Sequence, residues 1–541
     1  MRPLLALLSP SLVVPLAPVL AQSPIEVVLE QDQPIVGVGD VDTIDNLVVN
    51  DFGEARIWVD TDATTAVDEA IVDLNFAVLL QEGGALSAPA GATVKTFDSL
   101  TLDDAGGSFF NVRLDGTSGS SDDSGLFFGD QLLIQEGDLS TSSGFSGGTF
   151  YKDFREVKAD DHGAALAMVI VDDPSIIGNS NQALVRFQVD AGGNLASETV
   201  VGVSGSPMPG MTSLSGFLQQ PDQLAVNNAG QAMFVATGQP ANTLYLDQTP
   251  LIQEQTPSPI PGRDFSSLSS LSCDVNDHGD WVAHTLLTGT QDGNQVLLKN
   301  GAVLAHKGQT HPDIAPFVFT SLGSGPVHID NQGRALWYAA WSDGSSSNEG
   351  WFLDDELIIQ EGVTLAEGVP IFSVTGNART SDLSDDGGYF LFRGRTDGNH
   401  NAVFRTRLLP LTAEGGQISV SGGGTQDLTL DAGPAHAGKL YLVAGSLSGT
   451  SPGTPLPLVT VPLNQDSYLV LSITKANQAP FVNTFGVLDG QGRGSAAIAL
   501  PPGTGIVGLA GLTAHHAFVA LDPVTAAAEF ASNAVPLTFT N

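Results

Sequence analysis

The chain contains a single cysteine, Cys273, so an internal disulfide is excluded and the fold must depend on packing alone. Basic residues are also scarce: 20 Lys and Arg stand against 59 Asp and Glu, which gives a formal net charge of −39. Nucleic acids and anionic membranes are bound through clustered Lys and Arg, so neither is expected as a partner. An acidic surface instead suits cations or cationic polymers, or keeps the protein soluble in salt.

After residue 21 the sequence has no run of about 20 apolar residues, the length that a membrane-spanning helix needs. The first 21 residues have the order of a secretory signal peptide: Arg2, an apolar stretch from Leu4 to Leu20, and small residues around Ala21. We therefore expect an exported chain that starts near Gln22, located outside the cell or at its surface, with the periplasm as an alternative. At roughly 520 residues it should form two or more domains.

A four-residue turn of the Asn/Asp-x-x-Gly type recurs through most of the chain. Asn and Asp bond to their own turn and Gly accepts a left-handed backbone, so such a turn between apolar segments indicates a β-hairpin. Aromatic and β-branched segments follow the turns, for example RALWYAAW at 334–341, as expected of strands. The turns close at seven glycines: Gly53, Gly106, Gly163, Gly230, Gly279, Gly333 and Gly387.

A second recurring element is an apolar strand that ends in Gln-Glu-Gly, as in LLIQEGD at 132–138. Its glutamates are Glu82, Glu136, Glu254 and Glu361. We interpret them as the end of the outer strand of each repeat, because residues at the rims of separate units cannot converge on one substrate.

Each repeat is therefore predicted to form four short strands. Four-stranded units at this spacing are typical of a β-propeller, whose small sheets are buried between their neighbours. Seven turns predict seven blades. The segment 25–32 (IEVVLEQD) has the pattern of a fourth strand, and 401–407 (NAVFRTR) has that of a third strand without its fourth. We expect the N-terminal strand to complete the last blade and close the ring, which leaves no open edge.

The turn in VNDHGD (275–280), followed by an apolar strand and by LLIQEGD, resembles a group of uncharacterised bacterial secreted proteins with propeller-type repeats. The resemblance covers about residues 25–408. The segment 422–453, together with HHAFVALDP at 515–523, is similar to a C-terminal module common on bacterial secreted proteins. These motifs imply a fold and carry no catalytic residues.

Beyond Pro410 the turn period stops, and a different β structure is expected. Strands are predicted at 427–431, 439–446, 468–473, 483–488, 494–500, 516–522 and 534–539. Seven short strands over about 130 residues indicate a β-sandwich. The predicted all-β chain thus consists of a signal peptide (1–21), a seven-bladed propeller (22–409) and a β-sandwich module (410–541). By analogy at the level of the fold, such a module is more typical of adhesion or spacing than of catalysis.

Charged residues recur eight positions before the turn glycines, at the expected start of the inner strand and beside the central channel. They are Asp45, Asp98, Arg155, Asp222 and Arg379. A ring of this kind either forms ion pairs between blades or binds a ligand at the mouth of the channel, and both interpretations stay open.

The loop 114–125 (LDGTSGSSDDSG) offers Asp115, Asp122 and Asp123 together with hydroxyl and carbonyl oxygens, the ligands that calcium prefers. Their spacing matches no defined calcium motif, so a solvated loop is the alternative. Trp337 and Trp341 share one face of a predicted strand. They either pack between blades or form a platform on which sugars stack.

The sequence contains no nucleophile elbow, zinc signature, phosphate loop or dinucleotide fingerprint. The favoured prediction is a secreted or surface-associated binding protein that recognises an extracellular polymer, a protein or a cation through its long loops, with calcium as the candidate cofactor. One alternative is a polysaccharide-active hydrolase or lyase in which the charged ring supplies acid and base. The other is a structural component of the envelope. The sequence specifies neither the ligand nor the oligomeric state.

Overall fold

The computed structural model describes residues 25–176, 181–290, 293–342, 344, 347–433, 436–450, 453–456, 459–490, 492–503 and 509–540. The predicted signal peptide lies outside these residues. The chain forms two compact units, Pro24–Leu408 and Leu409–Asn541. Both are built almost entirely from strands in small sheets. Within the described ranges, no helix is long and apolar enough to cross a membrane.

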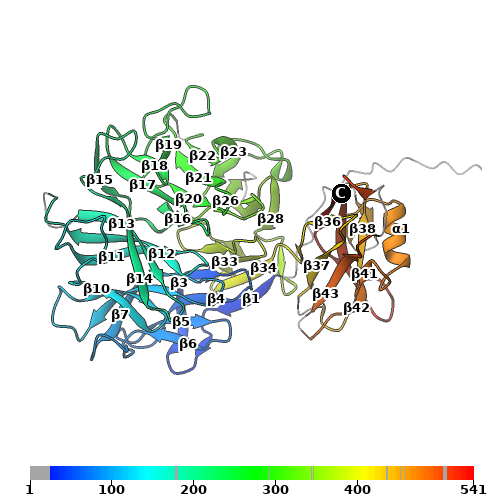
Figure 1. Ribbon diagram of the computed structural model, residues 1–541, viewed down its shortest axis with the longest axis horizontal. Helices are drawn as coiled ribbons and strands as arrows, with labels where there is room; N and C mark the ends of the chain where they lie inside the picture. Colours follow the sequence, from blue (N-terminus) through cyan, green and yellow to red (C-terminus); the bar gives the residue numbers. More distant parts are fainter. Residues whose placement is uncertain are drawn as a thin grey trace, which may run out of the picture. The chain divides into compact units, whose positions relative to one another are not determined.

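The first unit contains, among its described residues, seven antiparallel sheets of four or five strands (Figure 1). Sheet 1 consists of β2 (Pro34–Ile35), β3 (Gly39–Val49), β4 (Ala55–Thr61), β5 (Glu69–Asp73) and β6 (Val78–Gln81). Sheet 2 consists of β7 (Thr93–Leu100), β8 (Phe109–Asp115), β9 (Ser124–Phe128) and β10 (Gln131–Gln135). Sheet 3 consists of β11 (Phe150–Ala159), β12 (Ala164–Asp172), β13 (Asn181–Val189) and β14 (Leu195–Val203).

Sheets 4 to 7 repeat this pattern, with shorter inner strands. Sheet 4 consists of β15 (Ser213–Phe217), β16 (Leu224–Val226), β17 (Ala232–Gln239), β18 (Thr243–Leu246) and β19 (Thr249–Gln253), with the 3-10 helix η1 (Pro221–Gln223) before β16. Sheet 5 consists of β20 (Ser272–Val275), β21 (Trp281–Leu286), β22 (Gln295–Lys299) and β23 (Ala302–His306). Sheet 6 consists of β24 (Phe319–Ser321), β25 (His328–Ile329), β26 (Ala335–Ser342), β27 (Ser347–Leu353) and β28 (Glu356–Gln360), after the 3-10 helix η2 (Pro312–Ile314). Sheet 7 consists of β31 (Ser373–Val374), β32 (Ser381–Leu383), β33 (Tyr389–Arg395), β34 (Asn401–Arg407) and β1 (Glu26–Glu30), and the hairpin β29 (Leu365–Ala366) and β30 (Val369–Pro370) precedes it.

The faces of neighbouring sheets pack against each other, which explains why strands such as RALWYAAW are apolar on both sides. Trp337 of sheet 6 stacks on Phe352 with 4.6 Å between ring centres, in a cluster that includes Val282 and Leu297 of sheet 5. Trp337 and Trp341 are each only 2% exposed. The packing interpretation of these tryptophans is therefore right, and the sugar platform is wrong.

The inner strands of the seven sheets contact one another in a closed cycle. The order is β3, β7, β11, β16, β20, β25, β32 and back to β3. The N-terminal strand β1 pairs antiparallel with β34, with Val27 opposite Phe404 and Glu30 opposite Ala402. An ion pair of 2.7 Å between Arg405 and Glu26 joins the same two strands. The expected completion of the last sheet by the N-terminal strand is confirmed.

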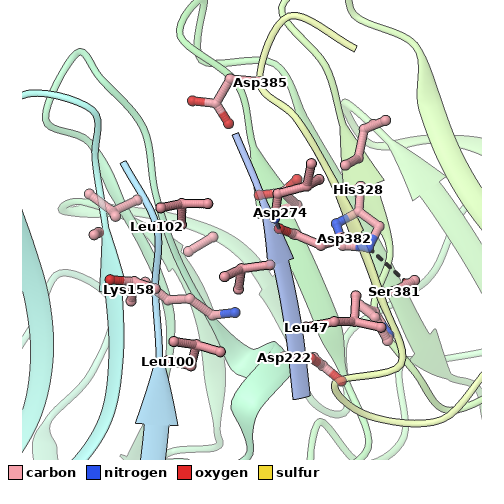
Figure 2. A pocket seen from close by; sticks show the side chains of 18 of the residues that line it. Leu47, Leu100, Leu102, Lys158, Asp222, Asp274, His328, Ser381, Asp382 and Asp385 are labelled. Carbon is pink, nitrogen blue, oxygen red and sulfur yellow. Dashed lines mark hydrogen bonds between the residues drawn. The ribbon is translucent and has the colours of Figure 1, made fainter. Parts of the chain in front are cut away.

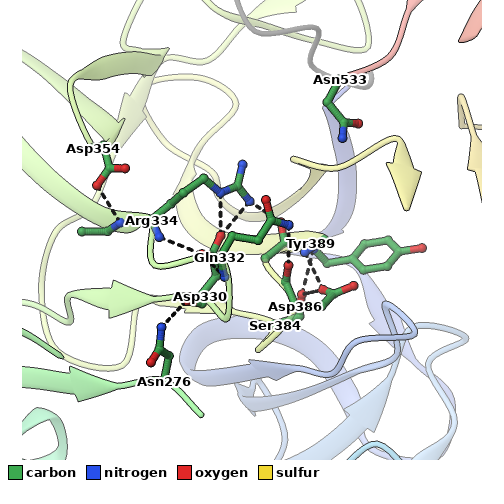
Figure 3. Close-up of polar contacts among 12 residues, drawn as sticks. Asn276, Asp330, Gln332, Arg334, Asp354, Ser384, Asp386, Tyr389 and Asn533 are labelled. Carbon is green, nitrogen blue, oxygen red and sulfur yellow. Dashed lines mark hydrogen bonds and ion pairs between the residues drawn. The ribbon is translucent and has the colours of Figure 1, made fainter. Parts of the chain in front are cut away.

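The predicted turns bond to themselves through their first residue. In the turn that closes at Gly279, the Oδ1 atom of Asn276 accepts from the backbone N–H of His278 (3.0 Å) and of Asp280 (2.9 Å). The Nδ2 atom of Asn276 donates to the carbonyl oxygen of Asp330 in the next turn (2.8 Å; Figure 3). Each turn glycine has a φ between 71° and 84°, in the left-handed region that glycine adopts without a Cβ clash.

The second residues of the turns form a ring of hydrogen bonds, which we call the turn belt. Its members are Asp51, Asp104, Asp161, Asn228, Asp277, Asn331 and Asp385. In the first five links, the backbone N–H of one member donates to the side-chain oxygen of the next, at 2.7 to 3.0 Å. Asn331 donates to the carbonyl oxygen of Asp385 (2.7 Å), and the N–H of Asp386 donates to Asp51 (2.9 Å) and closes the belt. The turns thus connect the sheets as well as the strands within them.

The second unit contains two main sheets that share one hydrophobic cluster. One consists of β35 (Leu411–Glu414), β37 (Gly424–Asp431), β43 (Arg493–Leu500) and β41 (Phe481–Val482). The other consists of β36 (Gln417–Ser419), β46 (Val535–Thr540), β44 (Thr513–Leu521), β38 (Leu440–Ser446), β42 (Phe485–Val487) and β45 (Ala528–Ala531). A hairpin of β39 (Thr454–Pro455) and β40 (Thr460–Val461) accompanies them.

The strand predicted at 468–473 is wrong: this segment lies in the helix α1 (Ser467–Thr474). Asp466 caps the helix, because its Oδ1 atom accepts from the backbone N–H of Leu469 (2.8 Å). Tyr468, Leu469 and Ser472 are buried at helical spacing. The N-cap and this periodicity outweigh the strand preference of the apolar run YLVLSI.

Candidate ligand site in the axial channel

The inner strands of the first unit surround a cavity of about 140 Å³, to which all seven sheets contribute (Figure 2). Four residues of the turn belt line one end: Asp51, Asp104, Asp161 and Asp385. Glu156, Asp222 and Arg379 line it toward the opposite ends of the inner strands. We call this second end the channel mouth. It comprises these three residues together with Asp45, Asp98 and Arg155.

None of the five charged residues that were expected at the mouth starts an inner strand. Asp45, Asp98 and Arg155 lie on β3, β7 and β11. Asp222 lies in η1 instead, where Pro221 occupies the first helical turn. Arg379 precedes β32 with a φ of 58°, a left-handed conformation that no strand contains. The predicted position at a strand start is therefore wrong for all five residues: the inner strands of sheets 1 to 3 begin five or six residues earlier, and those of sheets 4 and 7 are interrupted at Asp222 and Arg379.

The structure nevertheless brings these residues into one electrostatic network. Arg379 forms an ion pair with Glu156 (2.7 Å) and donates to the carbonyl oxygen of Asp98 (2.7 Å). Arg379 also influences the carboxyl groups of Asp45 and Asp222. Arg155 pairs with Asp153 at 2.6 Å. Ion pairing at the mouth is thus observed.

Two residues of this network, Arg113 and Asp153, were missed by the sequence analysis. Arg113 pairs with Asp153 (2.6 Å) and with Asp98 (3.3 Å). Arg113 lies on the second strand of its sheet, and Asp153 lies ten residues before its turn glycine. Neither falls in the register that was searched, so only a search across neighbouring strands could have found them.

A second set of polar residues, also missed, lies in the middle of the cavity. Lys158, Asp274, His328 and Asp382 all occur five residues before a turn glycine. Asp274 accepts from the backbone N–H of Ile329 (2.9 Å), and Asp382 accepts from that of Val49 (2.8 Å), so each carboxylate bonds to the next sheet. A search of this register would have revealed the four residues together.

Lys158 extends its ammonium group into the cavity from β11 (Figure 2). It forms no hydrogen bond or ion pair within the part of the chain that the structure describes. Burial raises the pKa of Asp222 and of Asp274 to about 6, and that of Asp382 to about 7, although the charge of Lys158 opposes each shift. Burial also lowers the pKa of His328 to about 3, so this imidazole is neutral.

This arrangement can bind a polar ligand, because it combines an unpaired ammonium group with carboxyl groups that change protonation near neutral pH. A resident metal ion fits it poorly. Asp274 and Asp382 already accept backbone hydrogen bonds, and no group of three or more His, Cys, Asp or Glu side chains in the described ranges could hold a metal.

The three aspartates of the proposed calcium loop face different partners. Asp122 accepts from the backbone N–H groups of Ser118 and Gly119, both at 2.9 Å. Asp115 lies 3.8 Å from Lys95, and Asp123 lies 3.8 Å from Arg113. The loop therefore uses these oxygens for its own hydrogen bonds and for ion pairs.

The glutamates of the Gln-Glu-Gly elements lie beyond the outer strands of their sheets. Burial and a hydrogen bond to Asp68 raise the pKa of Glu82 to about 7, and burial and Asp123 raise that of Glu136 to the same value. Glu254 instead accepts from the backbone N–H of Leu268 (2.8 Å). Each of the four glutamates directly follows the last residue of an outer strand, as the sequence predicted.

No protein-family model and no curated protein matches the chain. Among solved structures, the extracellular region of plexin A4 aligns over 95% of this chain and 67% of its own, with 9% identity and a TM-score of 0.31. The polysaccharide lyase Uly1 aligns over 69% and 91%, with 9% identity and a TM-score of 0.34. The calcium-binding protein regucalcin from Agrobacterium tumefaciens aligns over 72% and 95%, with 11% identity and a TM-score of 0.27. At these values the likenesses carry no conclusion about function.

Proposed function

We propose that the chain is an exported seven-bladed β-propeller with a C-terminal β-sandwich module, and that it binds an extracellular ligand through the channel mouth and the cavity behind it. The closed cycle of inner strands, the pairing of β1 with β34 and the turn belt support the seven blades. The cluster shared by the two sheets of the second unit supports the sandwich.

The axial cavity is the observation that carries the binding function. A channel with only a structural role would be filled by apolar side chains or by complete ion pairs, which leave no charged group facing open space. Here Lys158 extends into about 140 Å³ of space without a partner in the described residues, opposite carboxyl groups with raised pKa values. A ligand with hydrogen-bond acceptors toward Lys158 and donors toward Asp274 and Asp382 would satisfy both sides.

A polysaccharide-active hydrolase or lyase is the second candidate, and Asp382 is the residue that favours it. A carboxyl group with a pKa of about 7 is suited to general acid catalysis near neutral pH. His328 lines the same cavity, but its pKa of about 3 makes it too weak a base for catalysis near neutral pH. Against this candidate, ion pairs occupy the charged groups at the mouth, through which a polymer would have to enter.

The binding proposal can be tested with wild type and Lys158→Ala. Both proteins are applied to glycan and peptide arrays, with and without calcium, and hits are measured by isothermal titration calorimetry. We expect Lys158→Ala to weaken binding at least tenfold. Lys95→Ala is the matched control, since Lys95 is exposed and, among the described residues, its one ion pair is with Asp115 on the surface. Equal affinity of wild type and Lys158→Ala for every hit would exclude the cavity as the site.

The enzyme candidate has a separate test. Release of reducing ends and of unsaturated products is measured on the polysaccharides that bind. Activity that disappears in Asp382→Asn while binding persists would establish catalysis.

A further inference from the structure

Arg379 reaches across the channel mouth from sheet 7 to three other sheets. Its Nη2 atom donates to the carboxylate of Glu156 on sheet 3 and to the carbonyl oxygen of Asp98 on sheet 2, both at 2.7 Å. Its guanidinium carbon lies 5.9 Å from the ring centre of Trp58 on sheet 1. Arg379 thus contacts three other sheets at the channel mouth.

The contacts that hold Arg379 are incomplete. Both hydrogen bonds use the same nitrogen, Nη2, whereas Nε is buried and has no partner in the described residues. The side chain remains 23% exposed. The backbone has a φ of 58°, which a residue with a Cβ adopts only at a cost. A cation that is not tied to this backbone could fit the same place with fewer constraints.

The groups around Arg379 form a socket with the chemistry of a guanidinium site. The socket consists of Trp58, the carbonyl oxygen of Asp98, Glu156 and Asp222. It offers an aromatic face, two carboxylates and a carbonyl acceptor, which are the groups that surround arginine side chains at interfaces. Trp58 is only 7% exposed, and its indole N–H is buried without a partner within the described ranges. This N–H cannot bond to a guanidinium, which has donors alone, so Trp58 contributes its aromatic face to the socket.

We propose that this socket recognises an arginine side chain of a partner protein, and that Arg379 is a built-in occupant that the partner displaces. The inference rests on the proposed binding function and names the chemistry of the ligand. The net charge of −39 attracts a cationic partner at long range, and the socket then selects arginine by shape and by the aromatic contact. Arg379 keeps the mouth closed to other cations until such a partner arrives.

The test removes the built-in occupant. Arg379→Gly empties the socket, and its fit to the left-handed backbone offsets part of the cost of leaving the buried Glu156 without its ion pair. The probe is N-acetyl-arginine amide, titrated into the full chain by calorimetry. We expect Arg379→Gly to bind the probe at least tenfold more tightly than wild type, and N-acetyl-citrulline amide, which has the same shape without the charge, not to bind.

Three further variants complete the design. Arg379→Gly combined with Glu156→Gln should lose the gain, because the carboxylate that pairs with the guanidinium is gone. Arg493→Ala removes an arginine from the second unit and should bind the probe as weakly as wild type. If Arg379→Gly does not fold, Arg379→Asn serves in its place, since Asn also tolerates the left-handed region.

Equal affinity of wild type and a folded Arg379→Gly for the arginine probe would overturn the inference, as would equal binding of the citrulline probe. That failure differs from failure of the proposed function. An array ligand whose binding depends on Lys158 would still establish the cavity as a binding site without any preference for arginine.

Discussion

The turn belt leads to a quantitative prediction for Asn276→Ala. Asn276 is 4% exposed and forms three hydrogen bonds: two accepted within its own turn and one donated to Asp330 in the next sheet. A net value of about 0.5–1.5 kcal/mol for each bond gives a loss of roughly 3 kcal/mol in the free energy of unfolding. Over the roughly 385 residues of the first unit, the entropy of unfolding is about 0.8 kcal/mol per kelvin. We therefore expect the melting temperature to fall by about 4 °C.

Tryptophan fluorescence is the appropriate assay, because all five tryptophans of the chain belong to the first unit. The matched control is His278→Ala in the same turn. His278 is exposed, and its side chain makes no hydrogen bond within the described residues, so the melting temperature should change by less than about 1 °C. Asn276→Asp keeps the two accepted hydrogen bonds and loses the donated one. Its melting temperature should therefore lie between those of Asn276→Ala and His278→Ala. Equal melting temperatures of Asn276→Ala and His278→Ala would refute the reasoning.

Four other predictions concern titration, ring closure and the second unit. Burial lowers the pKa of His284 to about 4, and both ring nitrogens lack partners in the described ranges, so the unfolded state binds a proton first as pH falls from 6.5 to 4. His284→Leu should remove about 3 kcal/mol of the acid sensitivity between these values, seen as a smaller difference between melts at pH 7.5 and 4.5. The contribution of Asp382 to stability depends on pH in the opposite direction. Its pKa rises to about 7, so the folded state retains the proton between pH 4 and 7, and stability is lost as pH rises through that range. Asp382→Asn should therefore raise the melting temperature at pH 8 and leave it unchanged at pH 4.5. Leu29 lies in β1 and is 1% exposed, so Leu29→Ala should lower the free energy of unfolding of the first unit by about 3 kcal/mol, measured by urea unfolding. Val28 is partly exposed, and Val28→Ala should lower it by less than about 1 kcal/mol. Asp466→Ala removes the cap of α1 and should accelerate hydrogen exchange across 467–474 at least tenfold, whereas unchanged exchange would show that the cap is dispensable.

The features that the sequence predicted well depend on local geometry. A side chain such as that of Asn276 satisfies its own turn, and the glycine three residues later accepts the left-handed backbone, so both residue types recur wherever the turn does. The pairing of β1 with β34 was predictable for a related reason, because each segment has the pattern of one half of a repeat.

The site was harder to predict because it depends on contacts between sheets. The search eight residues before each glycine found Arg379 but placed it at the start of a strand, whereas its backbone is left-handed. Lys158 and Asp382 each lie five residues before a turn glycine, three positions later than Arg379 does. Other repeats have apolar residues such as Val48 at this position, so no recurring charge is visible there. Trp58 has no sequence signal as part of the mouth, since only the fold brings it under Arg379. In the second unit, the N-cap at Asp466 did give a local signal for a helix, and the apolar run after it concealed that signal.

The pairing of β1 with β34 has a consequence for how the protein matures. Glu26 and Arg405 are 379 positions apart, so the sheet that closes the ring joins the first strand of the first unit to its last. Such a long-range contact is slow to form, since a large chain loop must close before it yields any stabilisation. During synthesis the strand β1 stays unpaired until nearly four hundred further residues have been added. An unpaired strand edge that persists for this long is prone to aggregate, so folding of the first unit should benefit from a chaperone that binds β1 until β34 is available.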